Sequence, residues 1–178
     1  MNRGSDPFLF RQIQVLIVDD NQFVRKLIRS MLRQLGIQEI HEATDGLEAV
    51  EAIAARDCNL VLLDWRMPGF TGEEFLEMIR RSPEPRLQSL PVIVLSAFTS
   101  YSMVIRAASA GANAVVVKPL SITILGRRIE KVMREALGLY APQPVHVPIS
   151  ATPVTHDLGE LLATEKEDAD EGLEVYSI

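Results

Sequence analysis

The chain alternates short apolar runs with segments of helical periodicity, and this alternation constrains the fold more than any other feature. Five runs have the length and composition of β-strands, at residues 15–18, 39–43, 60–63, 92–95 and 114–117. Four of them are nearly continuous in apolar residues, which is typical of strands buried on both faces of a parallel sheet. Residues 39–43 instead alternate polar and apolar side chains, which favours a position near a sheet edge. The pattern predicts an α/β fold with helices on both faces of one parallel sheet.

Helical segments lie between these runs and are marked by apolar residues three or four positions apart. The expected helices cover residues 23–35, 47–54, 75–79, 103–108 and 121–133. The first is expected to end at Gly36, because glycine readily adopts the left-handed conformation that follows many helices. The third is expected to end at the proline-containing segment 82–91. The last is expected to begin at Ser121, a residue type that favours helix N-termini.

The character of the chain changes after Gly138. Prolines at positions 142, 144, 148 and 153 preclude a helix there and favour an extended linker. Residues 138–178 carry eight carboxylates against one lysine, a formal −7 that leaves +1 for the rest of a chain whose net charge is −6. We therefore predict a domain over residues 12–138, an N-terminal extension over 1–11 and an extended C-terminal tail over 139–178. The acidic part of the tail is either disordered or docks on the basic fifth helix or on a partner.

Composition excludes several functional classes. No apolar run approaches the length that crosses a bilayer, and the N-terminus lacks the continuous apolar stretch of a secretory signal, so membrane insertion and export are not expected. The single cysteine, Cys58, precludes an internal disulfide and fits a reducing, cytoplasmic location. The three histidines lack metal-ligand spacing. The basic residues of the fifth helix lack aromatic interleaving, so nucleic-acid binding is not expected either.

Polar side chains close four of the five apolar runs. Asp19-Asp20 follows the first run, Asp64 the third, Ser96 the fourth and Lys118-Pro119 the fifth. Because the carboxyl ends of parallel strands meet at one edge of the sheet, these side chains are expected to converge there. Taken singly, each has an ordinary interpretation, since the acids suit caps or turns, the serine a strand end and the lysine a solvated surface. Only their joint spacing favours a functional site.

Three clustered carboxylates repel one another unless a cation neutralises them, and an acidic site built only of oxygen ligands is typical of Mg²⁺. A carboxylate can also attack phosphorus and form an acyl phosphate. In that chemistry Asp64 is the candidate nucleophile, Lys118 neutralises charge on the transferring oxygens, and Ser96 donates a hydrogen bond to another oxygen. The strand ends therefore predict a site for a metal ion and a phosphoryl group.

The motifs at these positions resemble those of the response-regulator receiver domain, the phosphoacceptor module of two-component signalling. They read VLIVDDN, VLLDWRMPGFTG, VIVLSAF and VVVKP, and the resemblance covers residues 12–137. The offset of 22 residues from Ser96 to Lys118 also matches the family. The resemblance implies a flavodoxin-like (βα)5 three-layer sandwich whose parallel sheet has the order 2-1-3-4-5.

The resemblance further implies a role for each site residue and a cis peptide bond between Lys118 and Pro119. Phosphoryl transfer would use the phosphoacceptor Asp64 together with Ser96 and Lys118. Magnesium would be held by Asp20, Asp64, the backbone carbonyl of Arg66 and, through water, Asp19.

Two positions depart from the usual family pattern. Many receivers carry, three residues before the lysine, an aromatic residue that swings inward on phosphorylation, and here that position is Val115. Signalling would then rely on Ser96 moving toward the phosphoryl group and on local repacking. Arg66 stands two residues past the acceptor, where three roles stay open for its guanidinium: contact with a phosphoryl oxygen, contact with an acidic partner, or exposure to solvent. We predict that Arg66 alters the lifetime of the acyl phosphate.

The sequence is interpreted as a stand-alone receiver that accepts a phosphoryl group on Asp64 from a histidine kinase or phosphotransfer protein. It is expected to switch a protein-interaction surface for an unknown downstream target, as a monomer or a phosphorylation-linked homodimer. Beyond its own phosphoryl transfer and hydrolysis, it is expected to be a signalling domain and not an enzyme. Two alternatives stay open: a phosphorylation-independent scaffold on the same fold, and a haloacid-dehalogenase-like phosphatase, whose second acid would stand where this chain has Arg66.

Overall fold

A five-stranded parallel sheet forms the centre of the structure, a computed structural model that describes residues 7–97 and 100–139. The strands are β1 (Gln14–Val18), β2 (Glu39–Ala43), β3 (Leu60–Asp64), β4 (Val92–Ser96) and β5 (Ala114–Val117). They lie in the order β2-β1-β3-β4-β5, which confirms the predicted sheet order. The alternating strand, β2, lies at one edge, as expected.

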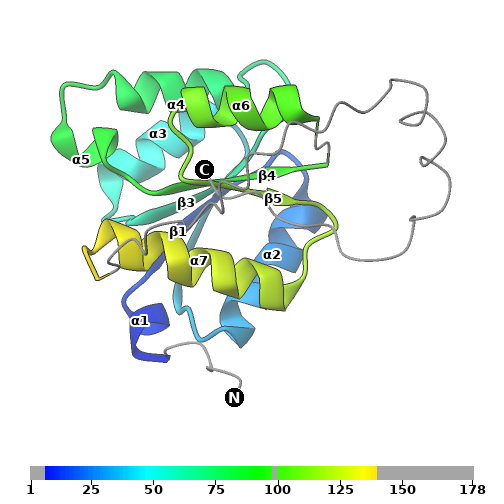
Figure 1. Cartoon of the computed structure of the whole chain (residues 1–178), viewed down its shortest axis with the longest axis vertical. Coiled ribbons are helices and arrows are strands. Elements are labelled where there is room, and N and C mark those ends of the chain that lie inside the picture. Colours follow the sequence, from blue (N-terminus) through cyan, green and yellow to red (C-terminus); the bar gives the residue numbers. More distant parts are fainter. Residues whose placement is uncertain (1–6, 98–99, 140–178) are drawn as a thin grey trace, which may run out of the picture. The chain divides into compact units, whose positions relative to one another are not determined.

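Helices cover both faces of the sheet, which confirms the predicted three-layer fold (Figure 1). Side chains of α3, α4 and α6 pack on one face, and those of α1, α2 and α7 pack on the other. The helices are α1 (Pro7–Arg11), α2 (Gln22–Gln34), α3 (Gly46–Ala55), α4 (Gly72–Arg80), α5 (Pro85–Gln88), α6 (Tyr101–Ser109) and α7 (Ile122–Ala136).

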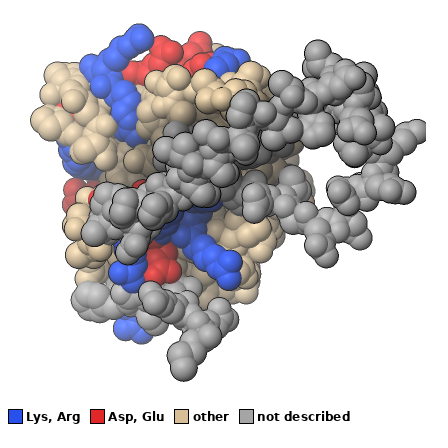
Figure 2. All heavy atoms as spheres, viewed as in Figure 1, with Lys and Arg blue, Asp and Glu red and all other residues tan. Residues whose placement is uncertain are grey.

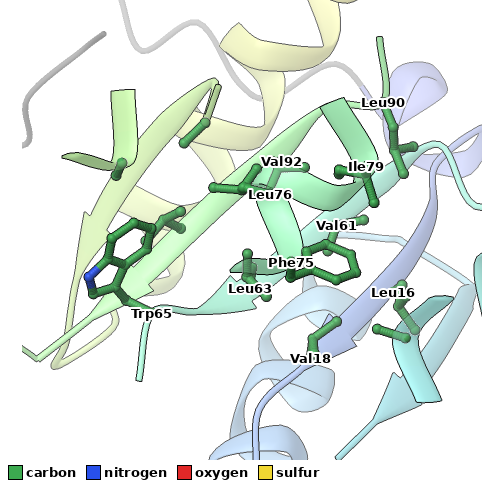
Figure 3. Close-up of a cluster of buried hydrophobic side chains, with 14 of the residues drawn as sticks. Leu16, Val18, Val61, Leu63, Trp65, Phe75, Leu76, Ile79, Leu90 and Val92 are labelled. Carbon is green, nitrogen blue, oxygen red and sulfur yellow. The ribbon is translucent and has the colours of Figure 1, made fainter. Parts of the chain in front are cut away.

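Successive strand residues point into two different cores. In β1, Leu16 and Val18 belong to the core shared with α4, whereas Val15 and Ile17 belong to the core shared with α7. Figure 3 shows Phe75 of α4 among the strand side chains of the first core. Because both faces of the central strands are buried, their sequences are continuous in apolar residues instead of alternating.

Two short helices were not predicted from the sequence. Helix α1 has five residues and α5 has four, which is too short for a helical period to be recognised. Helix α5 begins at Pro85, a position where proline is tolerated because no partner is needed for its nitrogen. Leu9 and Phe10 of α1 are 5% and 1% exposed and belong to the core shared with α7. Part of the predicted N-terminal extension therefore contributes to the core.

The helix ends show which local signals acted as predicted. Helix α2 is followed at Gly36 by a left-handed residue with φ of 96°, as expected. At its start, the Asn21 side chain accepts hydrogen bonds from two first-turn amides. Ser121 does precede α7, but its side chain makes no capping hydrogen bond. Ser121 is therefore the N-cap residue of α7, as predicted, but it accepts the Leu125 amide through its backbone carbonyl, at 2.9 Å, and not through its hydroxyl.

No helix in the described ranges is long and apolar enough to cross a membrane. Residues 140–178, which include most of the predicted tail, lie outside the described residues. The docking of the acidic segment on α7 therefore stays a hypothesis.

Replacement of Phe10 by alanine is expected to destabilise the protein by about 3–5 kcal/mol, because it removes a large side chain from a packed core. Urea unfolding followed by far-ultraviolet circular dichroism measures the change. Phe23→Ala is the matched control, because Phe23 is 79% exposed. That control should change the free energy of unfolding by less than about 0.5 kcal/mol. Equal small effects in both variants would show that α1 does not stabilise the core.

Candidate functional site

The register of the sheet brings the predicted site residues to one edge. Asp64 pairs with Leu95 across β3 and β4, and Ser96 pairs with Val117 across β4 and β5. Asp19 directly follows β1, between the ends of β2 and β3. Because all strands are parallel, their polar last residues lie at the same end of the sheet.

Asp19, Asp20 and Asp64 form an acidic cluster. One carboxylate oxygen from each residue lies within 4.8 Å of the other two. Asp19 is fully buried, Asp64 is 9% exposed, and Asp20 faces solvent. Oxygen donors at this spacing, open to water on one side, fit the coordination that Mg²⁺ prefers. The residues present therefore fit a magnesium ion.

Lys118 bridges two of the three carboxylates. Its Nζ atom lies 2.8 Å from Asp19 Oδ2 and 3.3 Å from Asp64 Oδ1. The backbone amide of Lys118 donates to the carbonyl of Ser96 at 2.7 Å, which ties the end of β5 to the end of β4. The peptide bond between Lys118 and Pro119 is cis, as the resemblance implied. The ammonium group is thus placed against the two buried carboxylates, Asp19 and Asp64.

The environment of Asp64 makes its carboxylate easier to protonate than that of an ordinary aspartate. Burial raises the pKa of Asp64 above the ordinary value of an aspartate, and the nearby Asp19 carboxylate acts in the same direction. The Lys118 ammonium opposes both effects. The backbone N–H of Arg66 also donates to Asp64 Oδ1, over a long distance of 3.5 Å. A bound cation would relieve the same repulsion that raises this pKa.

A cavity of about 390 Å³ lies beside the acceptor, between the loop after β3 and the start of α6. Trp65 and Arg66 line one side, and the paired side chains of Glu73 and Arg106 line another. Trp65 is 7% exposed and lies at the margin of the first core (Figure 3). The cavity is therefore bordered by the two residues that follow Asp64, and not by the acidic cluster itself.

Sequence reasoning missed the residues that hold the loop after β1. The backbone N–H of Asn21 donates to Asp19 Oδ1 at 2.9 Å. Arg25 of α2 donates through Nη1 to the backbone carbonyl of Asp19 at 2.8 Å. Asn21 was recognisable as a helix cap, but Arg25 lies in a helix with several other basic residues. Nothing in its sequence context distinguishes it from a solvated arginine.

The geometry is that of a known signalling family. The family model described as the response regulator receiver domain matches residues 15–130. The chain belongs to the response-regulator receiver family. This receiver is 36% identical over 126 residues to the chemotaxis protein CheY of Pseudomonas aeruginosa, covering 71% of this chain and 100% of the relative. It is 35% identical over 127 residues to CheY-3 of Vibrio cholerae, covering 71% and 96%.

Solved structures agree with the family assignment. The crystallised chemotaxis protein CheY4 of Vibrio cholerae superposes with a TM-score of 0.63 and 28% identity, covering 67% of this chain and 98% of that chain. The predicted resemblance to the receiver family is therefore confirmed. Proteins of this family are signalling domains and not metabolic enzymes, and they bind Mg²⁺ at an acidic pocket like the one formed by the three aspartates.

The outer side of α7 in this receiver is basic. Figure 2 shows Lys and Arg side chains gathered over the helix, with an acidic group among them. Arg134 pairs with Glu130 at 3.1 Å and Lys131 with Glu135 at 3.9 Å. Both are pairs of residues four positions apart, which stabilise a solvent-facing helix by a few tenths of a kcal/mol. Part of the positive charge is thus balanced within α7 itself.

Replacement of Asp64 by asparagine is expected to stabilise the metal-free protein near neutral pH, because it removes one of three crowded carboxylates and keeps the side-chain shape. The pKa of Asp64 is raised in the folded state, so its ionisation favours unfolding and its protonation favours folding. The advantage of the variant should therefore be lost as the pH falls through the pKa of Asp64.

Urea unfolding in the presence of a chelator, repeated across the acidic and neutral range, measures this difference. Asp57→Asn is the matched control, since the Asp57 side chain is 90% exposed. A variant that is less stable than the parent at neutral pH would contradict the predicted repulsion.

Proposed function

We propose that Asp64 accepts a phosphoryl group from a phosphohistidine, and that the phosphorylated receiver presents a changed surface to a downstream protein. The observation that carries this proposal is the convergence of three carboxylates and one ammonium at the sheet edge. The membership of the chain in the receiver family supports it, as do relatives named for chemotaxis signalling.

In the forward reaction an oxygen of Asp64 attacks the phosphorus atom of the donor's phosphoimidazole. The new bond joins that oxygen to phosphorus, the phosphorus–nitrogen bond breaks, and the imidazole leaves with the electron pair. Lys118 already lies against Asp64 and would neutralise charge on the transferring oxygens. Ser96, at the end of β4 and 2% exposed, would donate its hydroxyl to another of them. In hydrolysis, water attacks the same phosphorus and releases phosphate.

We propose the magnesium ligands that the family resemblance implies, and the clustering of the three aspartates supports this assignment. Asp20, Asp64 and the backbone carbonyl of Arg66 would bind the ion directly, and the buried Asp19 would act through water. When bound, the ion supplies positive charge to the phosphoryl oxygens. The chain's own residues orient the acceptor, because Lys118 and the Arg66 amide fix one Asp64 oxygen and leave the other for attack.

We infer the partners from this chemistry. The donor is a sensor histidine kinase or a phosphotransfer protein, the target is a further protein, and the receiver acts in the cytoplasm as a monomer or a phosphorylation-linked homodimer. Nucleic acid is not a proposed partner, since the basic face of α7 carries its own acidic residues.

Val115 stands at the position where many receivers carry an aromatic switch, so a different structural change must transmit phosphorylation to the protein surface. Val115 is 2% exposed and packs in the same core as the buried side of α6. A packed valine cannot rotate between an inward and an outward position, so we propose that Ser96 draws β4 toward the phosphoryl group and that α6 repacks in response. The ion pair of Glu73 with Arg106 joins α4 to α6 beside the acceptor and would move with it.

Incubation with acetyl phosphate and Mg²⁺ is expected to add one phosphoryl group to the parent protein and none to Asp64→Asn. Intact-protein mass spectrometry detects the adduct. Asp57→Asn, which removes an exposed aspartate that precedes the opposite end of β3, should be labelled like the parent. A parent that stays unlabelled under these conditions, and also fails to bind beryllofluoride, would favour the phosphorylation-independent scaffold.

Loss of the Arg66 side chain is expected to shorten the lifetime of the acyl phosphate. Arg66 is exposed and lines the cavity beside the acceptor, so Arg66→Ala widens the approach for water to the phosphorus. We expect decay to accelerate at least about twofold, a barrier change of about 0.4 kcal/mol. Decay of the phosphorylated species after removal of acetyl phosphate gives the rate. The control is Arg81→Ala, since Arg81 caps the C-terminus of α4 and its side chain is 79% exposed. Identical decay in Arg66→Ala and the parent would remove the idea.

A further inference from the structure

Four polar residues are buried in the described part of the chain: Asp19, Arg25, Asp64 and Ser96. Three of them belong to the proposed phosphoryl site, and the fourth, Arg25, comes from α2. The Arg25 side chain is only 10% exposed. Burial of a guanidinium group is costly unless its donors are satisfied, so its contacts indicate what it does.

Arg25 joins the loop after β1 to strand β2. Its Nη1 atom donates to the backbone carbonyl of Asp19 at 2.8 Å, in a buried hydrogen bond. Its Nε atom donates to Glu42 Oε2 at 3.1 Å. Glu42 also accepts from Arg29, through its other oxygen, at 2.6 Å. Arg25 and Arg29 therefore share one carboxylate, but only Arg25 reaches Asp19.

The Asp19 carbonyl lies just beyond the end of β1, where its hydrogen bond comes from Arg25 and not from a neighbouring strand. The N–H of Asp19 still donates to the Ala43 carbonyl at 3.2 Å, but β1 ends at Val18 and β2 ends at Ala43. This carbonyl belongs to the rigid peptide plane that joins Asp19 to Asp20. Fixing its oxygen therefore fixes the direction in which the chain continues to Asp20.

Asp20 depends on this backbone restraint more than the other two acids. Asp19 is held by Lys118 and by the Asn21 amide, and Asp64 by Lys118 and the Arg66 amide. The structure, over the residues that it describes, gives the Asp20 side chain no hydrogen bond or ion pair. Its place in the acidic cluster is therefore set by the peptide that precedes it.

We propose that Arg25 is a positioning residue of the phosphoryl site, which holds the Asp19–Asp20 peptide so that the Asp20 carboxylate stands ready to bind Mg²⁺. This inference rests on the proposed function of the acidic cluster. Helix α2 would then support metal binding without supplying a ligand. It would act through the hydrogen bond from Arg25 to the backbone carbonyl of Asp19.

The experiment compares Arg25→Met with Arg29→Met. Both variants remove one arginine from Glu42, and only the first removes the donor to the Asp19 carbonyl. Magnesium affinity is measured by titration of the fluorescence of Trp65, the single tryptophan of the chain and the neighbour of Asp64. Arg25→Met should weaken binding by about 10- to 100-fold, as is typical when a group that orients a metal ligand is removed. Arg29→Met should stay within about twofold of the parent.

A metal-free measurement separates positioning from the function of the site. The Asn21 amide, which donates to Asp19 Oδ1, should exchange its hydrogen faster in Arg25→Met than in Arg29→Met when both are studied by nuclear magnetic resonance with a chelator. Urea unfolding establishes that each variant is folded under these conditions. If Arg25→Met does not fold, Arg25→Lys replaces it, because one ammonium cannot reach Glu42 and Asp19 with the geometry of a guanidinium.

The outcomes are distinguishable. A parent protein that shows no response to Mg²⁺ contradicts the proposed function, while the exchange of Asn21 still reports on Arg25. Magnesium affinity in Arg25→Met equal to that of the parent overturns the positioning role, whatever the exchange rate. Weaker binding in Arg25→Met and Arg29→Met to the same extent also overturns it, because the effect would then arise from Glu42.

Discussion

The contact of one ammonium group with two buried carboxylates is the interaction on which the site depends. Asp19 and Asp64 stand at the ends of neighbouring strands, where their charges repel and burial raises the pKa of Asp64. Lys118 reaches them from β5, across the intervening end of β4. The sheet order therefore determines the contacts of the site, since another order would separate the Lys118 ammonium from the two carboxylates that it neutralises.

The same arrangement lowers the stability of the folded protein when no metal is bound. Ionised Asp64, whose pKa is raised, opposes folding, and such sites persist because the surrounding structure determines them. Here that structure is two packed apolar cores, one on each side of the sheet. Under the proposed function, binding of a cation or a phosphoryl group would change the balance of charge at the ends of β1 and β3.

The parts of the fold that the sequence predicted are those with a repeated local signal. The five strands were recognisable because buried parallel strands are continuous in apolar residues, and β2 because it alternates at an edge. Helices α1 and α5 were missed because a helix of four or five residues is too short to show a helical period. Ser121 was predicted as a helix cap, but its side chain makes no capping hydrogen bond. In the site, Asp64 and Lys118 were predicted, because they close strands.

By itself, the sequence determined the fold class, the polar residues at the strand ends and the family to which they belong, since each follows from local composition and spacing. Only the tertiary structure decided which groups touch: that Lys118 lies between Asp19 and Asp64, and that Arg25 turns inward to a backbone carbonyl while Arg29 stays partly in solvent. Two arginines one helical turn apart look alike in sequence. They differ in the structure because burial of a guanidinium is costly unless a buried acceptor satisfies it. The Asp19 carbonyl is such an acceptor for Arg25, and Arg29 stays more exposed.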